Sequence, residues 1–351
     1  MTSRLQVLVV DDSAIVRQVL TSLLSPRFDV DTAADPIIAR KRMERRRPGV
    51  IVLDLNMPRV DGITFLREIM REDPVPVVIC SSAATRGSEA AMRALEEGAV
   101  DIILKPQVGV REFLEEAQSQ LTDTLRAAAS ARVKRRLPKL PVTPRHSADV
   151  VLKRSAIRAV TAGDTIVAVG ASTGGTEALR EIIESLPADA PGMVVVQHMP
   201  EGFTAAFAKR LDMLSAVEVK EAEDGDVVAR GRVLIAPGDR HLLLRRNTSG
   251  HFVQTLSGPP VSRHRPSVDV LFRSVAQAAG ANAIGVLLTG MGDDGAQGLS
   301  EMHATGATTI AQDEATSVVF GMPKEAIQRG AVTHVMPLDS IAAAITRFAK
   351  R

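Results

Sequence analysis

A turn of small residues between an apolar strand and a helix constrains the fold of this chain more than any other feature. Ile166–Val169 has the composition of a buried strand, and the apolar spacing of Thr176–Leu186 predicts a helix. Between them, Gly170–Gly175 reads Gly-Ala-Ser-Thr-Gly-Gly, which is typical of a tight turn. Open α/β folds place such turns, and their ligands, at the carboxyl edge of a parallel sheet. We therefore expect Ser172 to present an exposed hydroxyl at that edge.

Two further apolar strands lead to residues of complementary chemistry. Met193–Gln197 precedes His198, and Ile284–Thr289 precedes Asp294. A hydroxyl, an imidazole and a carboxylate at neighbouring strand ends are the components of a hydrolytic triad. The sequence therefore predicts a hydrolase site built from Ser172, His198 and Asp294.

Each of these residues also has a simpler interpretation. Ser172 could only cap a helix, Asp293 competes with Asp294 for the carboxylate role, and His198 could be a surface histidine. We expect a surface role for the remaining isolated histidines, His146, His251 and His303. A dinucleotide phosphate is another ligand for a glycine-rich turn. However, Gly170–Gly175 lacks the Gly-x-Gly-x-x-Gly spacing, and no acidic residue ends a second strand about 20 residues later.

Composition sets the class of protein. A chain of 351 residues with 45% apolar residues suits two domains, and 3% aromatic residues imply aliphatic cores. Cys80 is the only cysteine, which excludes an internal disulfide. We find neither a signal peptide nor an 18-residue apolar run, so with a single cysteine we expect a cytoplasmic protein without membrane insertion. We also expect a monomer.

The positive charge is concentrated in one segment. Residues 126–158 carry ten basic residues against Asp149 alone, and Pro138, Pro141 and Pro144 lie among them. Such a composition is typical of a flexible linker. We therefore expect a first domain at residues 1–125, a basic linker at 126–160 and a second domain at 161–351.

Strands and helices alternate five times before the linker. The expected strands are Leu5–Val10, Phe28–Thr32, Val50–Asp54, Val77–Cys80 and Val100–Leu104. The expected helices are Ser13–Leu24, Asp35–Arg47, Gly62–Arg71, Ser88–Glu97 and Val110 to about Ala129. This pattern predicts an α/β domain whose five-stranded parallel sheet is covered on both faces.

The βα alternation resumes at Thr165 and is interrupted once. Gly231–Arg246 and His251–Leu256 resemble antiparallel hairpin material. We therefore expect a second α/β domain that is doubly wound and mainly parallel, with an antiparallel hairpin.

Charged and polar residues end the strands of the first domain. Asp11 and Asp12 follow the first strand, Asp54 ends the third, Ser81 follows the fourth and Lys105 the fifth. Three carboxylates at one sheet edge favour a hard divalent cation, typically Mg²⁺. The hydroxyl and the ammonium could hold a phosphoryl group on Asp54 beside that metal.

These residues resemble those of response-regulator receivers. The Asp11-Asp12 pair, the stretch Val52–Pro58 and Lys105-Pro106 carry the likeness. The resemblance implies a flavodoxin-like fold, Mg²⁺ at Asp11, Asp12 and Asp54, and phosphorylation of Asp54 by a histidine kinase. It implies that Ser81 and Lys105 are the switch residues, and the adjacent Ser82 is the alternative to Ser81. Ile102 stands where receivers commonly have an aromatic switch residue.

The second domain resembles the chemotaxis protein-glutamate methylesterases. The likeness is carried by Gly170–Gly175, Gln197–Pro200, Arg263–Asp269, Leu288–Gly295, Gln312–Glu314 and Val318–Pro323. It implies that Ser172 is the nucleophile, His198 the general base and Asp294 the carboxylate that orients it. Backbone groups near Thr173 and at Met291 would stabilise the oxyanion, without a cofactor. His264 is expected to be structural or to face the substrate.

Together, the two resemblances imply a hydrolase that phosphorylation activates. It would demethylate glutamate methyl esters on methyl-accepting chemoreceptors and deamidate certain receptor glutamines. The rival is a response regulator without catalytic activity that binds proteins or nucleic acid. The basic cluster Arg40–Arg47 and the linker could serve the latter role, but they lack interleaved aromatic residues, so we expect a solvated face and no nucleic-acid partner.

Overall fold

The computed structural model describes residues 4–57, 61–81, 85–105, 111–131, 133 and 164–349. The chain divides into two compact units, Met1–Leu140 and Pro141–Arg351, and each is described by itself. Among the described residues, no helix combines the length and the apolar character that a membrane span requires.

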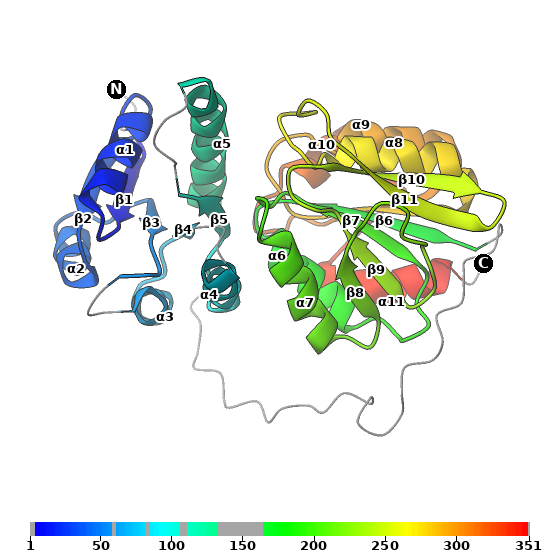
Figure 1. Ribbon diagram of the computed structural model, residues 1–351, viewed down its shortest axis with the longest axis horizontal. Coiled ribbons are helices and arrows are strands. Elements are labelled where there is room, and N and C mark those ends of the chain that lie inside the picture. The colour runs from blue at the N-terminus through cyan, green and yellow to red at the C-terminus, as the bar shows by residue number, and fades with distance from the viewer. Residues whose placement is uncertain are drawn as a thin grey trace. The chain divides into compact units, whose positions relative to one another are not determined.

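The first unit is a five-stranded parallel sheet with helices on both faces (Figure 1). Its strands, in the order β2-β1-β3-β4-β5, are β1 (Gln6–Val10), β2 (Asp29–Ala33), β3 (Val50–Leu53), β4 (Val77–Ser81) and β5 (Asp101–Leu104). Its helices are α1 (Ala14–Leu24), α2 (Pro36–Arg45), α3 (Gly62–Glu72), α4 (Thr85–Glu96) and α5 (Arg111–Ser130). The five predicted βα alternations are confirmed, and the Ser13 side chain caps α1 by accepting a hydrogen bond from the amide of Val16.

The burial of the strands agrees with their order in the sheet. The central strands β3 and β4 are buried along their whole length, whereas β2 at the edge is mostly half-buried. Apolar runs without alternation are what a parallel sheet covered on both faces requires. Because all five strands point the same way, their carboxyl ends share one edge.

The second unit is a seven-stranded parallel sheet with a separate hairpin (Figure 1). In the order β14-β13-β12-β6-β7-β9-β8, its strands are β6 (Ile166–Ala171), β7 (Met193–Gln197), β8 (Glu218–Glu221), β9 (Arg232–Ile235), β12 (Ala283–Leu287), β13 (Thr308–Gln312) and β14 (His334–Met336). The antiparallel hairpin consists of β10 (His241–Asn247) and β11 (Gly250–Leu256). The predicted doubly wound, mainly parallel fold with a hairpin is confirmed.

Helices cover both faces of this sheet. They are α6 (Gly175–Glu184), α7 (Thr204–Leu214), α8 (Val268–Ala279), α9 (Ala296–Ala304), α10 (Met322–Gln328) and α11 (Leu338–Phe348), with a 3-10 turn at Gly280–Asn282. Helices α6, α7 and α11 lie on one face, and α8, α9 and α10 lie on the other (Figure 1).

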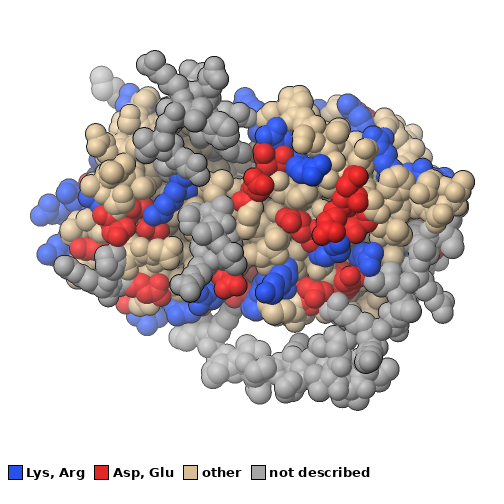
Figure 2. Space-filling view, in the orientation of Figure 1, with Lys and Arg blue, Asp and Glu red and all other residues tan. Residues whose placement is uncertain are grey.

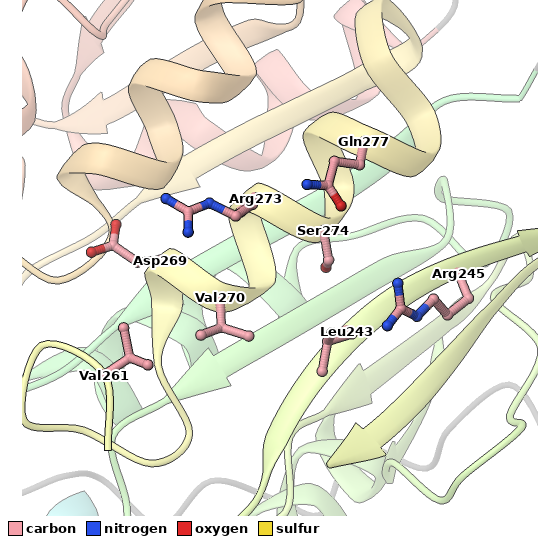
Figure 3. Close-up of a pocket in the computed structure, with 8 residues that line it drawn as sticks. All are labelled: Leu243, Arg245, Val261, Asp269, Val270, Arg273, Ser274 and Gln277. Carbon is pink, nitrogen blue, oxygen red and sulfur yellow. The ribbon is translucent and has the colours of Figure 1, made fainter. Parts of the chain in front are cut away.

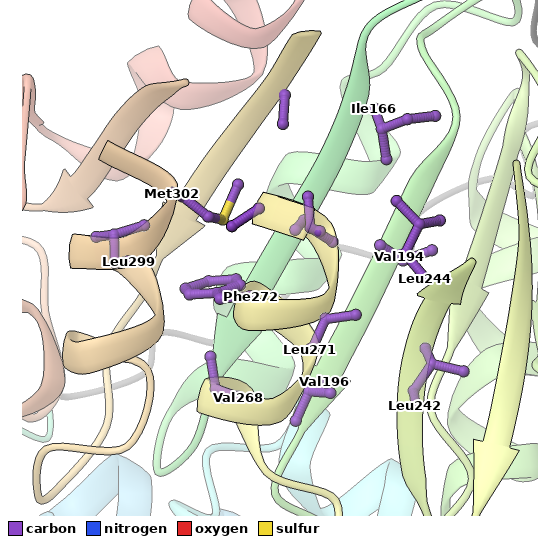
Figure 4. Packing of buried hydrophobic residues seen from close by; sticks show 14 of the residues in the cluster. Ile166, Val194, Val196, Leu242, Leu244, Val268, Leu271, Phe272, Leu299 and Met302 are labelled. Carbon is purple, nitrogen blue, oxygen red and sulfur yellow. The ribbon is translucent and has the colours of Figure 1, made fainter. Parts of the chain in front are cut away.

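Helix α8 lies in the middle of a hydrophobic core of the second unit. Val268, Leu271 and Phe272 are fully buried between the sheet, α9 and the hairpin (Figure 4). Burying side chains of this size contributes about 1.5–3 kcal/mol each, which fixes the position of α8 against β6. The start of α8 is therefore a rigid support for residues at the carboxyl edge.

Two sequence expectations for this unit are wrong. The segment expected to be wholly hairpin, Gly231–Arg246, contributes β9 to the parallel sheet, beside β7, before it enters the hairpin. His251, expected on the surface, is buried, and its Nε2 contacts the carbonyl oxygen of Ala278 at 3.2 Å. The backbone carbonyl at the end of α8 gives this polar ring a partner within the core.

Several expectations lie outside the described residues. They include most of the linker predicted at 126–160, together with Ser82, Pro106 and His146. The first residues of the predicted linker, 126–130, form the end of helix α5, which continues to Ser130.

Candidate active site and phosphorylation site

Three adjacent strands bring the predicted hydrolytic residues to one edge. Strand β6 lies between β7 and β12, and Ala171 pairs with Gln197 in the register. Ser172 and His198 are therefore the first residues beyond two paired strands. The Ser172 amide donates to the carbonyl of Thr289, beyond β12, at 3.0 Å. Ser172 is 8% exposed, so the prediction of a prominently exposed hydroxyl is wrong, because the surrounding loops pack closely around the turn.

His198 and Asp294 form a buried pair. His198 Nε2 lies 2.8 Å from Asp294 Oδ2, and the histidine side chain is only 8% exposed. An ionised carboxylate can only accept hydrogen bonds, so Nε2 is the nitrogen that carries the hydrogen. The other nitrogen, Nδ1, is buried and has no hydrogen-bond partner among the described residues. A neutral imidazole in this tautomer keeps the Nδ1 lone pair ready to take a proton.

Asp294 is held by four donors. Besides His198, its oxygens accept from Ser267 Oγ at 2.8 Å and from the amides of Val268 and Asp269 at 2.8 and 3.0 Å. Burial favours the neutral acid, but the hydrogen bonds and the charge of His198 outweigh it and lower the pKa of Asp294. Asp294 is therefore a carboxylate at neutral pH.

Asp293 lies in a different environment. Its side chain is 61% exposed, and it pairs with Arg329 at 3.2 Å on the surface. Of the two adjacent acids, the structure brings Asp294 and not Asp293 into contact with His198.

Glycines allow the loops to approach Ser172. A Cβ on Gly290 would lie 2.3 Å from Met322 Sδ and 2.8 Å from the Ser172 Cβ. A Cβ on Gly175 would lie 2.2 Å from Gln197 Oε1. Real Cβ atoms do not approach so closely, and so a side chain at either position would displace the turn.

The peptide between Gly290 and Met291 has a fixed orientation. The Gly290 carbonyl accepts from the amides of Gly321 and Met322 at 3.1 and 2.9 Å. In a trans peptide the N–H points opposite to the C=O. The Met291 N–H is therefore directed away from the start of α10. Thr173 is buried next to Ser172 in the turn before α6.

Further residues hold the site in ways that the sequence analysis missed. Gln197 Nε2 bridges the two strand ends by donating to the carbonyls of Ser172 and His198 at 3.0 and 3.2 Å. Asp269 Oδ1 accepts from the amides of Gly295 and Gly298 at 3.0 and 2.7 Å, which ties the start of α8 to the start of α9. A polar residue ending an otherwise apolar strand was the available signal for Gln197.

Asp269 also borders a hollow of about 350 Å³ beside α8 and β10 (Figure 3). The other lining residues are Leu243, Arg245, Val261, Val270, Arg273, Ser274 and Gln277. Neither Ser172 nor His198 lines it.

In the first unit, three carboxylates meet as the strand ends predict. Oxygen atoms of Asp11, Asp12 and Asp54 lie within 4.8 Å of one another, and Asp11 and Asp54 are buried. Lys105 Nζ lies 2.7 Å from Asp54 Oδ2 and 3.0 Å from Asp11 Oδ2. Burial raises the pKa of Asp11, although hydrogen bonds from Lys105 and Ser13 oppose it. One ammonium against three carboxylates leaves uncompensated negative charge, and an all-oxygen donor set of this kind fits Mg²⁺.

Other predicted receiver residues lie at the same edge or in the core. Ser81 is fully buried at the end of β4, and its backbone carbonyl accepts from the Lys105 amide at 3.0 Å. Burial disfavours the charged form of Lys105, but hydrogen bonds to Asp54 and Asp11 outweigh it and raise the pKa. Ile102 is buried in β5.

Arginines of the basic cluster Arg40–Arg47 are paired with acids. Arg40 contacts Glu68 and Glu72, Arg42 contacts Asp31, Arg46 contacts Asp29 and Arg47 contacts Asp73. Figure 2 shows basic and acidic side chains interspersed on the face in view. The local charge of the cluster is therefore largely balanced.

Comparison with known proteins assigns both units. Residues 167–345 match the CheB methylesterase family, and residues 7–118 match the response regulator receiver domain. The protein-glutamate methylesterase/protein-glutamine glutaminase 3 of Geobacter metallireducens is 55% identical, with 98% of this chain and 99% of the relative covered. The protein-glutamate methylesterase/protein-glutamine glutaminase 5 of Anaeromyxobacter dehalogenans is 58% identical, with 98% of this chain and 97% of the relative covered.

A solved structure is also similar. The CheB methylesterase catalytic domain of Thermotoga maritima is 43% identical and aligns with a TM-score of 0.52. The alignment covers 53% of this chain and 98% of that domain. With both units matched in order along nearly the whole chain, the protein belongs to the CheB methylesterase family and carries an N-terminal response-regulator receiver domain.

Proposed function

We propose that this protein is a phosphorylation-activated protein-glutamate methylesterase of the cytoplasm, acting on methyl-accepting chemoreceptors. The observation that carries the proposal is the buried His198–Asp294 pair beside Ser172, with Nδ1 of the imidazole left without a hydrogen-bond partner in the described part of the chain. Full-length similarity to enzymes named methylesterase and glutaminase supports the substrate class.

The proposed reaction begins at Ser172. Its Oγ attacks the carbonyl carbon of a glutamate methyl ester while Nδ1 of His198 takes the hydroxyl proton. Asp294 stabilises the imidazolium through the 2.8 Å contact with Nε2. The Met291 N–H and the backbone near Thr173 are the proposed donors to the oxyanion, since the Gly290 peptide is fixed by α10.

The attack of Ser172 produces a tetrahedral intermediate, and the collapse of this intermediate completes the first half of the reaction. His198 returns the proton to the methoxy oxygen, methanol leaves, and an ester of Ser172 remains. Water, deprotonated by His198, then attacks this ester, and His198 returns the proton to Ser172 Oγ as the free glutamate leaves. A glutamine side chain follows the same course with ammonia as the leaving group, which accounts for the proposed glutaminase activity. No cofactor takes part in this proposed scheme.

The receiver supplies regulation in this proposal. Asp11, Asp12 and Asp54 would hold Mg²⁺, whose charge would assist phosphoryl transfer from a histidine kinase to Asp54. Lys105, 2.7 Å from Asp54 Oδ2, would neutralise the phosphoryl group, and Ser81 would bind it as the switch hydroxyl. We assign the receiver, linker and hydrolase to residues 1–125, 126–160 and 161–351, and we expect a monomer.

A nucleic-acid-binding regulator is the weaker candidate. Arg40, Arg42, Arg46 and Arg47 already have acidic partners, so this cluster presents little excess positive charge to a phosphate backbone.

Methanol release from methylated receptor membranes, with and without a small-molecule phosphodonor, tests the proposal. Wild type should release methanol faster with the phosphodonor, whereas Ser172→Ala should release on the order of 10⁶-fold less in either condition. Release that does not depend on Ser172 would rule out the assigned nucleophile.

A further inference from the structure

A second histidine lies face to face with His198. The ring of His264 stacks on that of His198 with centroids 3.7 Å apart and planes 9° from parallel. The side chain of His198 is 8% exposed. Nothing in the proposed reaction uses His264, so the stack needs a separate explanation.

One hydrogen bond restrains the ring of His198. The imidazole turns about its Cβ–Cγ bond, and Nε2, which lies off that axis, is held by Asp294. A single hydrogen bond tolerates some angular deviation. Nδ1 has no hydrogen bond among the described residues, so the contact with the ring face is the second restraint on this rotation.

The loop that carries His264 is a constrained turn. Val261 and His264 exchange backbone hydrogen bonds of 3.0 and 2.9 Å. The two residues between them, Ser262 and Arg263, have φ values of 51° and 68°. Glycine or asparagine usually occupies such left-handed positions, and side chains held there mark sites where geometry is imposed by the surroundings.

Polar contacts on both sides hold this turn. Arg265 bonds to Asp239 and donates to the carbonyl of Gly258 at 2.5 Å. His241 Nε2 lies 3.0 Å from the carbonyl of Pro259. Ser262 Oγ donates to Asp269 at 3.1 Å, and Asp269 also supports the loop of Asp294.

Packing of the turn against the rest of the protein is limited. Val261 at its base borders the hollow of Figure 3 and is partly exposed. The polar contacts therefore account for much of its fixed position.

The charge state of His264 also suits its position against His198. Burial, and then the charge that His198 can carry, lower the pKa of His264 to about 3, against the opposing effect of Asp294. His264 is therefore uncharged at neutral pH. A neutral ring does not repel the imidazolium that His198 becomes when it takes the serine proton, whereas a second imidazolium at this distance would.

We propose that His264 is a positioning residue that fixes the ring plane of His198, so that Nδ1 stays oriented for proton transfer from Ser172. This inference rests on the proposed hydrolase function. It assigns His264 no proton transfer and no contact with the substrate.

Three substitutions separate positioning from other roles. His264→Phe keeps a flat neutral ring, His264→Leu fills part of the space without a flat face, and His264→Ala removes the contact. In the methanol-release assay, Ala and Leu should lower kcat about 10- to 100-fold with KM within about twofold, because general-base catalysis contributes about 10²–10⁴-fold. His264→Phe should recover kcat to within about threefold.

Asp239→Asn tests the same point without changing the stack directly. It weakens the contact with Arg265, so kcat should fall severalfold while KM stays constant. Thermal unfolding of each variant shows that it is folded. The downfield NMR signal of the His198 Nε2 proton should persist in His264→Phe and broaden in His264→Ala.

The outcomes are distinct. A raised KM in His264→Ala that Phe does not rescue would show that the ring contacts substrate, and unchanged kcat in Ala would show that it is dispensable. Either result overturns the inference. If wild type itself shows no hydrolysis that depends on Ser172, the proposed function fails instead.

Discussion

Replacing Asp294 with asparagine isolates the contribution of one negative charge to the site. Donors approach the carboxylate on both sides: His198 Nε2 and the Val268 amide on Oδ2, and Ser267 Oγ and the Asp269 amide on Oδ1. The side-chain amide of asparagine has one oxygen that accepts hydrogen bonds, and its other end is an NH₂ group that only donates them. Whichever way the substituted side chain turns, its NH₂ group faces a backbone N–H that then lacks an acceptor.

The magnitudes follow from this geometry. A buried amide left unpaired lowers the free energy of unfolding by about 1–3 kcal/mol. The charge that stabilises the imidazolium is lost in both orientations. When the NH₂ faces His198, Nε2 must accept and the hydrogen moves to Nδ1, which then cannot take the Ser172 proton. We therefore expect kcat for methanol release to fall roughly 10³–10⁴-fold, less than for Ser172→Ala or His198→Ala.

Asp293→Asn is the matched control. It makes the same chemical change one residue away, where the side chain is exposed and only the surface pair with Arg329 is lost. Such a pair contributes about 0–1 kcal/mol, and activity should stay within about twofold of wild type. Equal losses in the two variants, with both folded in a denaturant titration, would refute the assigned role of Asp294.

The sequence located strand ends better than it located loops. The strand expected at Met193–Gln197 matches β7, and the strand expected at Ile166–Val169 continues as β6 to Ala171 at the sheet edge. The residues that follow them are therefore placed by the strands themselves. That is why Ser172 and His198 emerge side by side, and why Asp11, Asp54 and Lys105 meet in the first unit.

Loop residues depend on contacts that sequence spacing does not encode. Asp293 and Asp294 are adjacent, and Asp294 is the one that turns inward because His198, Ser267 and the amides at the start of α8 supply its donors. The stack of His264 on His198 depends on a turn that Arg265 anchors to Asp239, 26 residues earlier in the chain. The strands β8 and β14 were missed because their residues are mostly half-buried or exposed, so neither contains an apolar run.

The remaining predictions probe the other contacts. Asp54→Asn should abolish labelling by a radioactive phosphodonor while leaving basal methanol release intact, and persistent labelling would contradict the assigned phosphorylation site. Gly290→Ala should lower kcat about 10²-fold, because its methyl group would push Ser172 aside. The methyl group of Gly292→Ala would meet nothing within 4 Å among the described residues, so this variant should cost little activity, although the φ of +85° lowers stability by about 1–2 kcal/mol.

Acid should destabilise the second unit through His264. The unfolded imidazole gains a proton below about pH 6.5, but folded His264 does so only near its pKa of about 3. The free energy of unfolding should therefore fall as the pH drops through this window, by up to about 1.4 kcal/mol per pH unit. Asp294, whose pKa is lowered, adds acid sensitivity only below about pH 4, where its unfolded carboxyl takes up a proton. Denaturant titrations at pH 7 and pH 5 therefore exclude the contribution of Asp294, and comparison with His264→Phe isolates that of His264. His264→Phe should lose less stability than wild type between these two values, and an equal loss in both proteins would show that His264 is charged in the folded state.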